Sequence, residues 1–269
     1  MARSLPGSLA PVVEELELEQ PHVVTLGRIA EIVERTVAGE TSKESQQIAY
    51  ELQRRGWLGR LRTMNVWEFF PGARAGAYGS GDRLIELRAQ LAVKPDMKIA
   101  LAMESAAVLN RLAQRVPEQE VVWLLARREP PKALRAFRVV HVDLPEESID
   151  RVDGLPVWGV EALLVGVAAK PSSYRDLAGL AQWLPESGAR IDYELLLACL
   201  GDANASTKQR TIYLLELAKR PDLAERLARL FPPSVPVWFG TARSGGRHDR
   251  LSRVLDAELA PLMSGGTGA

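Results

Sequence analysis

The chain has 269 residues, of which 46% are hydrophobic and 25% are charged, a composition typical of a water-soluble globular protein. This length suits one large domain or two ordinary ones. Because 34 basic residues balance 34 acidic ones, no global positive field draws the chain to nucleic acid, and any attraction to DNA must come from a local patch.

Cysteine content and hydropathy indicate a cytoplasmic protein that does not contact a membrane. The single cysteine, Cys199, excludes an internal disulfide framework and fits a reducing compartment. It lies in the apolar run 195–200, which predicts a buried structural thiol. The most apolar segment, residues 157–169, is short for a membrane span and contains Glu161, so it favours a buried helix. The N-terminus has no apolar signal region.

The first 56 residues predict helices and a short strand. A helix over residues 8–19 precedes a strand at 23–24. Thr25 is a suitable N-cap for a second helix, whose apolar residues recur at helical spacing. A third helix is expected between Gly39 and Gly56, because glycine commonly ends a helix.

A hairpin is predicted directly after the third helix. Residues 57–61 and 66–70 have the composition of strands and are separated by a four-residue loop. Trp57, Trp67 and Phe69 are better explained as core residues beneath this hairpin than as platforms for base stacking. Two successive helices followed by a basic hairpin indicate a winged helix-turn-helix, in which one helix enters the major groove of DNA.

The third helix and the hairpin supply the candidate DNA contacts. With Ile48, Ala49 and Leu52 turned inward, the opposite helix face is polar and can reach base edges, while the hairpin tip can reach the backbone or minor groove. Residues 42–76 carry six basic and three acidic side chains, a local excess in a neutral chain. Winged domains also bind proteins, and that alternative stays open. The predicted DNA-binding residues are Lys43, Gln46, Gln47, Tyr50, Arg54, Arg60, Arg62 and Asn65.

A second domain is expected after a linker at residues 71–81, which hold four Gly and three Ala. The DNA-binding domain would occupy residues 1–78, and a larger α/β domain rich in helices would occupy residues 79–269, so that the whole chain is α+β. Strands are expected at 121–125, 137–142 and 236–241. Helices are expected at 82–91, 98–115, 160–169, 174–183, 192–200, 207–219 and 222–230.

The sequence contains no recognisable catalytic constellation. His22, His141 and His248 are far apart and lie near no Cys or paired carboxylate at metal-ligand spacing. Neither a GxxxxGK[ST] nor a GxGxxG phosphate-binding motif follows a predicted strand. The Gly-Ser dipeptide at 79–80 lacks the acidic pair that a nucleotidyltransferase would place after it. We therefore expect no metal, no cofactor and no enzymatic activity.

One further polar cluster, residues 241–253, is rich in arginine. A solvated loop is its default interpretation, and the alternative is a docking surface for an acidic partner or for DNA. Together with two basic residues of a predicted helix, it supplies the candidate partner-binding residues. These are Lys208, Arg210, Arg243, Arg247 and Arg250.

Several segments together resemble the AbiEi family of type IV antitoxins, which includes the MenA-type antitoxins. No single segment is specific, but the set occurs in the order of the family and covers nearly the whole chain. The segments are LQRRGWL at 52–58 with VWEFFP at 66–71, AMESAAVL at 102–109, LPVWGVEALL at 155–164 and KQRTIYLLE at 208–216.

The resemblance implies two activities and no catalysis. An N-terminal winged helix domain would bind inverted repeats in its own promoter and repress it. A C-terminal α/β domain would oppose a cognate nucleotidyltransferase toxin, in a toxin–antitoxin system of the phage-defence type. Two alternatives remain: a stand-alone transcription regulator whose C-terminal domain dimerises or senses a ligand, and an enzyme with an unrecognised site.

Overall fold

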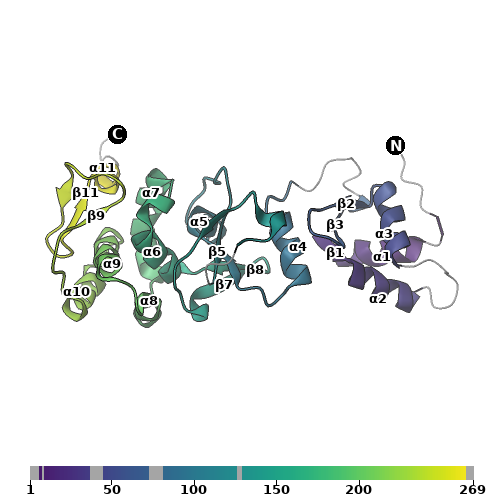
Figure 1. Cartoon of the computed structure of the whole chain (residues 1–269), viewed down its shortest axis with the longest axis horizontal. Helices are drawn as coiled ribbons and strands as arrows, with labels where there is room; N and C mark the ends of the chain where they lie inside the picture. Colours follow the sequence, from purple (N-terminus) through teal and green to yellow (C-terminus); the bar gives the residue numbers. More distant parts are fainter. Residues whose placement is uncertain (1–5, 8, 37–44, 73–80, 126–128, 265–269) are drawn as a thin grey trace. The chain divides into compact units, whose positions relative to one another are not determined.

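The computed structural model describes residues 6–7, 9–36, 45–72, 81–125 and 129–264 (Figure 1). Helices and several separate sheets alternate along the chain, so the predicted α+β class is confirmed. The chain divides into two compact units. Unit 1 comprises Met1–Met97 and Pro131–Arg135, and unit 2 comprises Lys98–Pro130 and Ala136–Ala269.

Unit 1 combines helices with an antiparallel sheet of order β1-β3-β2. The Thr25 hydroxyl accepts the backbone N–H of Arg28 at 3.1 Å, the predicted N-cap. Gly56, at φ +78°, lets the chain leave α3 and enter the hairpin. The elements are α1 Ala10–Glu19, β1 Val23–Thr25, α2 Leu26–Thr36, α3 Ser45–Arg54, β2 Leu58–Arg60, β3 Val66–Phe69, α4 Ile85–Val93 and the 3-10 helix η2 Lys132–Leu134.

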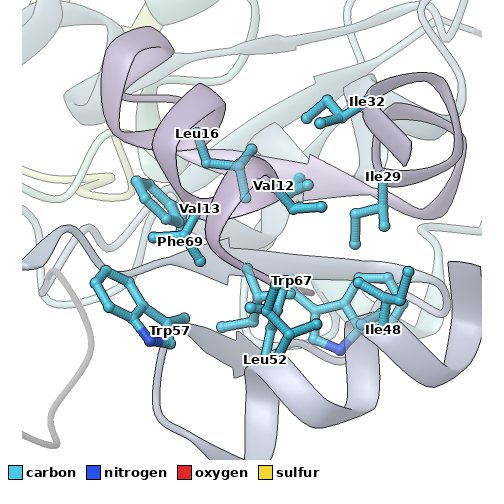
Figure 2. Close-up of a cluster of buried hydrophobic side chains, with 14 residues drawn as sticks. Val12, Val13, Leu16, Ile29, Ile32, Ile48, Leu52, Trp57, Trp67 and Phe69 are labelled. Atoms are coloured by element: carbon cyan, nitrogen blue, oxygen red, sulfur yellow. The ribbon is translucent and has the colours of Figure 1, made fainter. Parts of the chain in front are cut away.

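An apolar cluster joins the helices of unit 1 to its hairpin (Figure 2). Ile48 and Leu52 of α3 are fully buried, as predicted for the inward face of that helix. Trp57, Trp67 and Phe69 are each less than a tenth exposed, which confirms them as core residues. Since burying one large apolar side chain stabilises a fold by about 1.5–3 kcal/mol, this cluster fixes the hairpin against α3.

Unit 1 extends further along the chain than the division expected at residue 78. Helix α4 packs against β1 and β3, and η2 packs in turn against α4. Leu87 and Ala89 of α4 are fully buried. The sequence assigned α4 to the second domain because its apolar pattern follows the expected linker, of which residues 73–80 lie outside the described residues.

The larger sheet of unit 2 is mixed and five-stranded, with order β6-β5-β4-β8-β7. Strand β4 runs parallel to β8 and antiparallel to β5. The strands are β4 Ile99–Leu101, β5 Val121–Leu124, β6 Arg138–Val140, β7 Ile149–Val152 and β8 Leu155–Trp158.

The continuous helix predicted over residues 98–115 is wrong. Its first part is β4, and only Met103–Leu109 is helical, as α5. Because β4 pairs with strands on both sides and is almost fully buried, sheet pairing outweighs the helical preference of this Ala-rich stretch. Met103, the first residue of α5, has φ +48°, a left-handed conformation that would interrupt a continuous right-handed helix between β4 and α5.

The remaining elements of unit 2 are mostly helical. The helices predicted between residues 160 and 230 are confirmed, as is the late strand. The hairpin β7–β8 and the strands β10 Arg247–His248 and β11 Val254–Asp256 were not predicted. The helices are α6 Val160–Ala169, α7 Leu177–Ser187, α8 Tyr193–Leu200, α9 Ala205–Leu217, α10 Pro221–Leu230 and α11 Leu259–Ser264, with 3-10 turns η3 Glu146–Ser148, η4 Pro171–Ser173 and η5 Gly188–Arg190.

A second, three-stranded sheet of order β10-β11-β9 lies between α10 and α11 in sequence, and Figure 1 labels β9 and β11. Its strands are β9 Val237–Phe239, β10 Arg247–His248 and β11 Val254–Asp256. Almost all of α6 is buried, as predicted for the most apolar segment of the chain. Within the described ranges, no helix is both long enough and apolar enough to cross a membrane.

Candidate nucleic-acid interface

Most of the predicted DNA-binding residues surround one concave surface of unit 1, between α3 and the β2–β3 hairpin. This pocket has a volume of about 370 Å³. Sequence reasoning placed these side chains on two separate elements, and the fold brings five of them together. The lining residues predicted from the sequence are Gln46, Tyr50, Arg60, Arg62 and Asn65.

The outer face of α3 is exposed and polar. Gln46, Gln47 and Arg54 are exposed, and among the described residues none of their side chains has an ion-pair or hydrogen-bond partner. Tyr50 is 55% exposed, and its ring meets the Trp67 ring edge-on at a centroid distance of 6.5 Å. The core therefore orients Tyr50 without covering it. Lys43, also predicted to contact DNA, lies outside the described residues.

The hairpin contributes basic and amide groups at its exposed end. Arg60, Arg62 and Asn65 are exposed. Asn65 adopts φ +59°, a left-handed conformation that asparagine tolerates better than most residues. Its carbonyl oxygen accepts the backbone N–H of Leu26 at 2.9 Å, which fastens the end of the loop to the start of α2.

Among the lining residues that the sequence did not indicate as DNA contacts are Gln53 and Met64. The Gln53 side-chain oxygen accepts the indole N–H of Trp67 at 2.9 Å, so Gln53 orients the ring that supports Tyr50. Met64 is 84% exposed in the hairpin loop. An apolar side chain at a predicted hairpin tip was the available signal for Met64, whereas nothing local in the sequence indicated the Gln53 contact.

The candidate partner-binding residues of α9 are engaged within unit 2. The Arg210 guanidinium donates to the carbonyl oxygens of Trp238 at 2.7 Å and Ala168 at 3.2 Å. Burial, together with the charge of Arg243, lowers the pKa of Arg210 from its ordinary value. The Lys208 ammonium lies 4.3 Å from the centroid of the Phe231 ring. Both cations therefore support the packing of α9 against its neighbours.

The other candidates, Arg243, Arg247 and Arg250, are exposed on the segment between β9 and β11. The start of this segment is fixed, because the Glu258 carboxylate accepts the backbone N–H groups of Thr241 and Ala242, each at 2.6 Å. Burial opposes ionisation of Glu258, but these hydrogen bonds outweigh it and lower the pKa of the carboxyl. Arg243, although exposed, also donates to the carbonyl oxygens of Gly240 at 3.0 Å and Ala242 at 2.8 Å within this anchored loop.

The segment 102–109, which resembles AbiEi proteins, has structural contacts. The Glu104 carboxylate accepts Arg138 Nη2 at 2.6 Å and also the backbone N–H of Arg175. The Ser105 hydroxyl donates to Glu120 at 2.5 Å and accepts the backbone N–H of Val121 at 2.8 Å. These contacts join α5 to β5, β6 and the loop before α7, beside a pocket of about 220 Å³.

The described residues offer no alternative metal or thiol chemistry. Among them, no three His, Cys, Asp or Glu side chains gather closely enough to hold a metal ion. Cys199 is 2% exposed, which confirms the expected buried thiol, and burial raises its pKa to about 12. A thiol in this state is a weak nucleophile.

Comparison with known proteins confirms the resemblance to AbiEi antitoxins. Residues 99–217 match the model of the AbiEi antitoxin C-terminal domain. A crystal structure of the RV2827C protein from Mycobacterium tuberculosis is similar over 99% of this chain and 97% of its own, with 26% sequence identity and a TM-score of 0.81. No curated protein matches. Residues 99–217, nearly all of them in unit 2, are therefore similar to the C-terminal domain of AbiEi antitoxins.

Proposed function

We propose that this protein is the antitoxin of a type IV toxin–antitoxin pair and that unit 2 opposes a nucleotidyltransferase toxin. The observation that carries the proposal is the AbiEi match over residues 99–217. Nearly all of the matched segment belongs to unit 2, so the antitoxin activity is assigned to that unit. In this proposal the protein acts in the cytoplasm without catalysing a reaction of its own.

Unit 1, in the same proposal, is a winged helix-turn-helix domain that binds inverted repeats in the promoter of its own operon. The supporting features are the exposed polar face of α3, the adjacent hairpin with its exposed arginines, and the concave surface between them. Helix α3 would enter the major groove, and the hairpin would meet the backbone or the minor groove.

The exposed residues of this surface take different roles. Gln46, Gln47 and Tyr50 would read base edges, because Gln pairs bidentately with adenine and an aromatic ring packs on the thymine methyl group. Lys43, Arg54, Arg60, Arg62 and Asn65 would contact phosphate and sugar, which sets register and affinity but carries no sequence information.

For the toxin, the proposed contact is the exposed arginine segment of unit 2. Arg243, Arg247 and Arg250 would face an acidic surface of the toxin, since opposite charges across an interface steer association. Lys208 and Arg210 would contribute indirectly. Lys208 packs α9 against the Phe231 ring, and Arg210 donates to the carbonyl oxygen of Trp238.

The decisive experiment combines toxicity rescue with DNA binding by the full chain. If a neighbouring gene encodes a nucleotidyltransferase, coexpression with its product should restore growth, and the promoter fragment should shift in a gel at low salt. If about three phosphates are neutralised, a fourfold rise in salt should weaken binding by about 40-fold. Rescue without a shift would overturn the repressor role, and a shift without rescue would leave a stand-alone regulator.

The arginine segment is tested by charge reversal with a matched control. Arg243→Glu with Arg247→Glu should reduce both rescue and capture of the toxin. Lys219→Glu with Arg229→Glu makes the same change in charge at two other exposed positions of unit 2 and should leave both readouts unchanged. Equal behaviour of the two double variants would exclude the arginine segment as the docking surface.

A further inference from the structure

The loop of the β2–β3 hairpin is held by α4, a helix that lies outside the proposed DNA-contacting residues. The Glu86 carboxylate accepts the backbone N–H of Arg62 at 2.7 Å through Oε1, and the Thr63 hydroxyl at 3.3 Å through Oε2. Gln90 donates its side-chain N–H to the same Thr63 hydroxyl oxygen at 2.6 Å. Thr63 is 7% exposed, so this cluster forms the inner side of an otherwise exposed loop.

The start of helix α4, which carries Glu86 and Gln90, is fixed by contacts of its own. Asp82 accepts the backbone N–H of Leu84 at 2.9 Å and pairs with the Arg88 guanidinium at 2.9 Å, which fixes the start of the helix. Residues four apart on a helix share one face, so Glu86 and Gln90 reach the loop together. The chain enters unit 2 at Lys98, shortly after the end of α4.

The charge of Glu86 should, by itself, oppose DNA binding. A carboxylate beside a hairpin tip that approaches phosphate would repel it, so on charge alone the removal of Glu86 should raise the affinity for DNA. The hydrogen bonds of Glu86 predict the opposite, a loss of DNA affinity when Glu86 is removed. They order the backbone of Arg62 before DNA arrives, which reduces the conformational entropy lost on binding.

We propose that Glu86 is a positioning residue of the DNA interface, which acts through the backbone of Arg62. The inference rests on the proposed DNA-binding function of unit 1. The Glu86 carboxylate sets the direction in which the Arg62 side chain leaves the loop. Gln90 and Thr63 complete the same support.

The test compares full-length variants on the promoter fragment. Glu86→Ala should weaken binding about tenfold, the size of one lost charge-assisted contact, and should lower the salt slope by about one. Glu86→Gln keeps an acceptor for the Arg62 N–H and should stay within about twofold of the wild type. Glu14→Ala removes an acidic charge from an exposed site of the same unit and should not weaken binding.

A double-mutant cycle separates positioning from general electrostatics. If Glu86 acts through Arg62, the pair Glu86→Ala with Arg62→Ala should bind no more weakly than Arg62→Ala alone. Additive losses would overturn the proposal, and so would a gain in affinity in Glu86→Ala. Failure of the wild type to bind the promoter would overturn the proposed DNA-binding function itself. Equal binding by the wild type and Glu86→Ala would overturn only this inference.

A second variant covers the case in which Glu86→Ala does not fold, as judged by circular dichroism and thermal melting. Thr63→Val keeps the shape of the side chain and removes the hydroxyl that joins Glu86 and Gln90. It should weaken promoter binding several-fold, again without a further loss when combined with Arg62→Ala. Unchanged binding by a folded Thr63→Val variant would overturn the proposal.

Discussion

Charged and polar side chains lie in different environments in the two units. In unit 1 the polar face of α3 and the arginines of the hairpin are exposed. In unit 2 several charged groups lie inside the fold: Arg138 pairs with Glu104 at 2.6 Å, and the buried Asp256 accepts the Tyr213 hydroxyl at 2.6 Å. The exposed polar groups of unit 1 are therefore candidates for contact with another molecule, whereas the buried pairs of unit 2 hold its own elements together.

The same contrast applies within unit 2. Arg210 donates to two backbone carbonyl oxygens of its own unit, whereas Arg247 and Arg250 are exposed on a loop. Arg210→Ala would therefore disturb the packing of α9, and a loss of rescue in that variant would carry no information about the interface. The exposed loop arginines are the informative positions.

The comparison is tested most strongly by separating the units. A fragment that begins at Lys98 should rescue cells from the toxin and lose promoter binding completely, because every proposed DNA contact lies in unit 1. Pro131–Arg135 also belongs to unit 1, so its buried residues Ala133 and Leu134 should be replaced by Gly and Ser in this fragment. Rescue and gel shift are the measurements. A soluble fragment that does not rescue would show that unit 2 is not sufficient.

The buried pair of unit 2 should give the largest change in stability. Glu104→Ala leaves the Arg138 guanidinium without its carboxylate, and breaking a buried pair from one side costs about 3–5 kcal/mol. Lys98→Ala breaks a surface pair with Glu146 at 2.5 Å, where the expected loss is below about 1 kcal/mol. Urea unfolding of the two variants measures both, and similar losses would contradict the internal role of Glu104.

Base reading in unit 1 should have a smaller effect. Gln46→Ala or Tyr50→Ala should reduce the preference for operator over random DNA by about 1–3 kcal/mol, if each contacts a base. Arg62→Ala should instead weaken binding to both DNAs equally, because a phosphate contact carries no sequence information. Competition binding with the two DNAs distinguishes them. Loss of operator preference in Arg62→Ala alone would reverse the roles assigned to helix and hairpin.

The sequence predicted local features of the fold well. The inward face of α3, the Thr25 cap and the β2–β3 hairpin follow from periodicity and capping rules that act within a few residues. Strand β4 was missed because three apolar residues fit a helix or a strand equally well, and only its partners decide. The β7–β8 turn at Asp153 and Gly154 carried a hairpin signal that was overlooked.

The candidate site was only partly predictable for the same reason. Gln46, Tyr50 and Arg62 follow from helix faces and hairpin geometry. The contact between Glu86 and the backbone of Arg62 joins residues 24 positions apart, and no pattern in the sequence relates them. The engagement of Arg210 with Trp238 and Ala168 likewise depends on how distant elements pack.

The smallest predicted effect concerns a carboxyl pair of unit 2. Burial, and then the nearby Asp249 carboxyl, raise the pKa of Glu216 from 4.5 to about 8, against a smaller opposing effect of Arg247. Between about pH 4.5 and 8 the folded protein therefore holds a proton that the unfolded chain has released. Stability should be full below pH 4.5 and should decline as the pH rises to about 8.

Asp249 does not obscure this change. Burial opposes its ionisation, but hydrogen bonds from Ser252, together with the neighbouring Glu216 and the charge of Arg247, lower its pKa below 3.8, so its contribution is lost only in acid. Glu216→Gln removes the titrating carboxyl and should flatten the decline between pH 5.5 and 8.5. Because Glu216 is partly exposed, solvent screening limits the expected gain at pH 8.5 to about 1 kcal/mol. Urea unfolding at the two pH values measures this gain in stability, with Glu186→Gln at an exposed position as the matched control. A wild-type stability that rises over this range would contradict the assignment of the proton to Glu216.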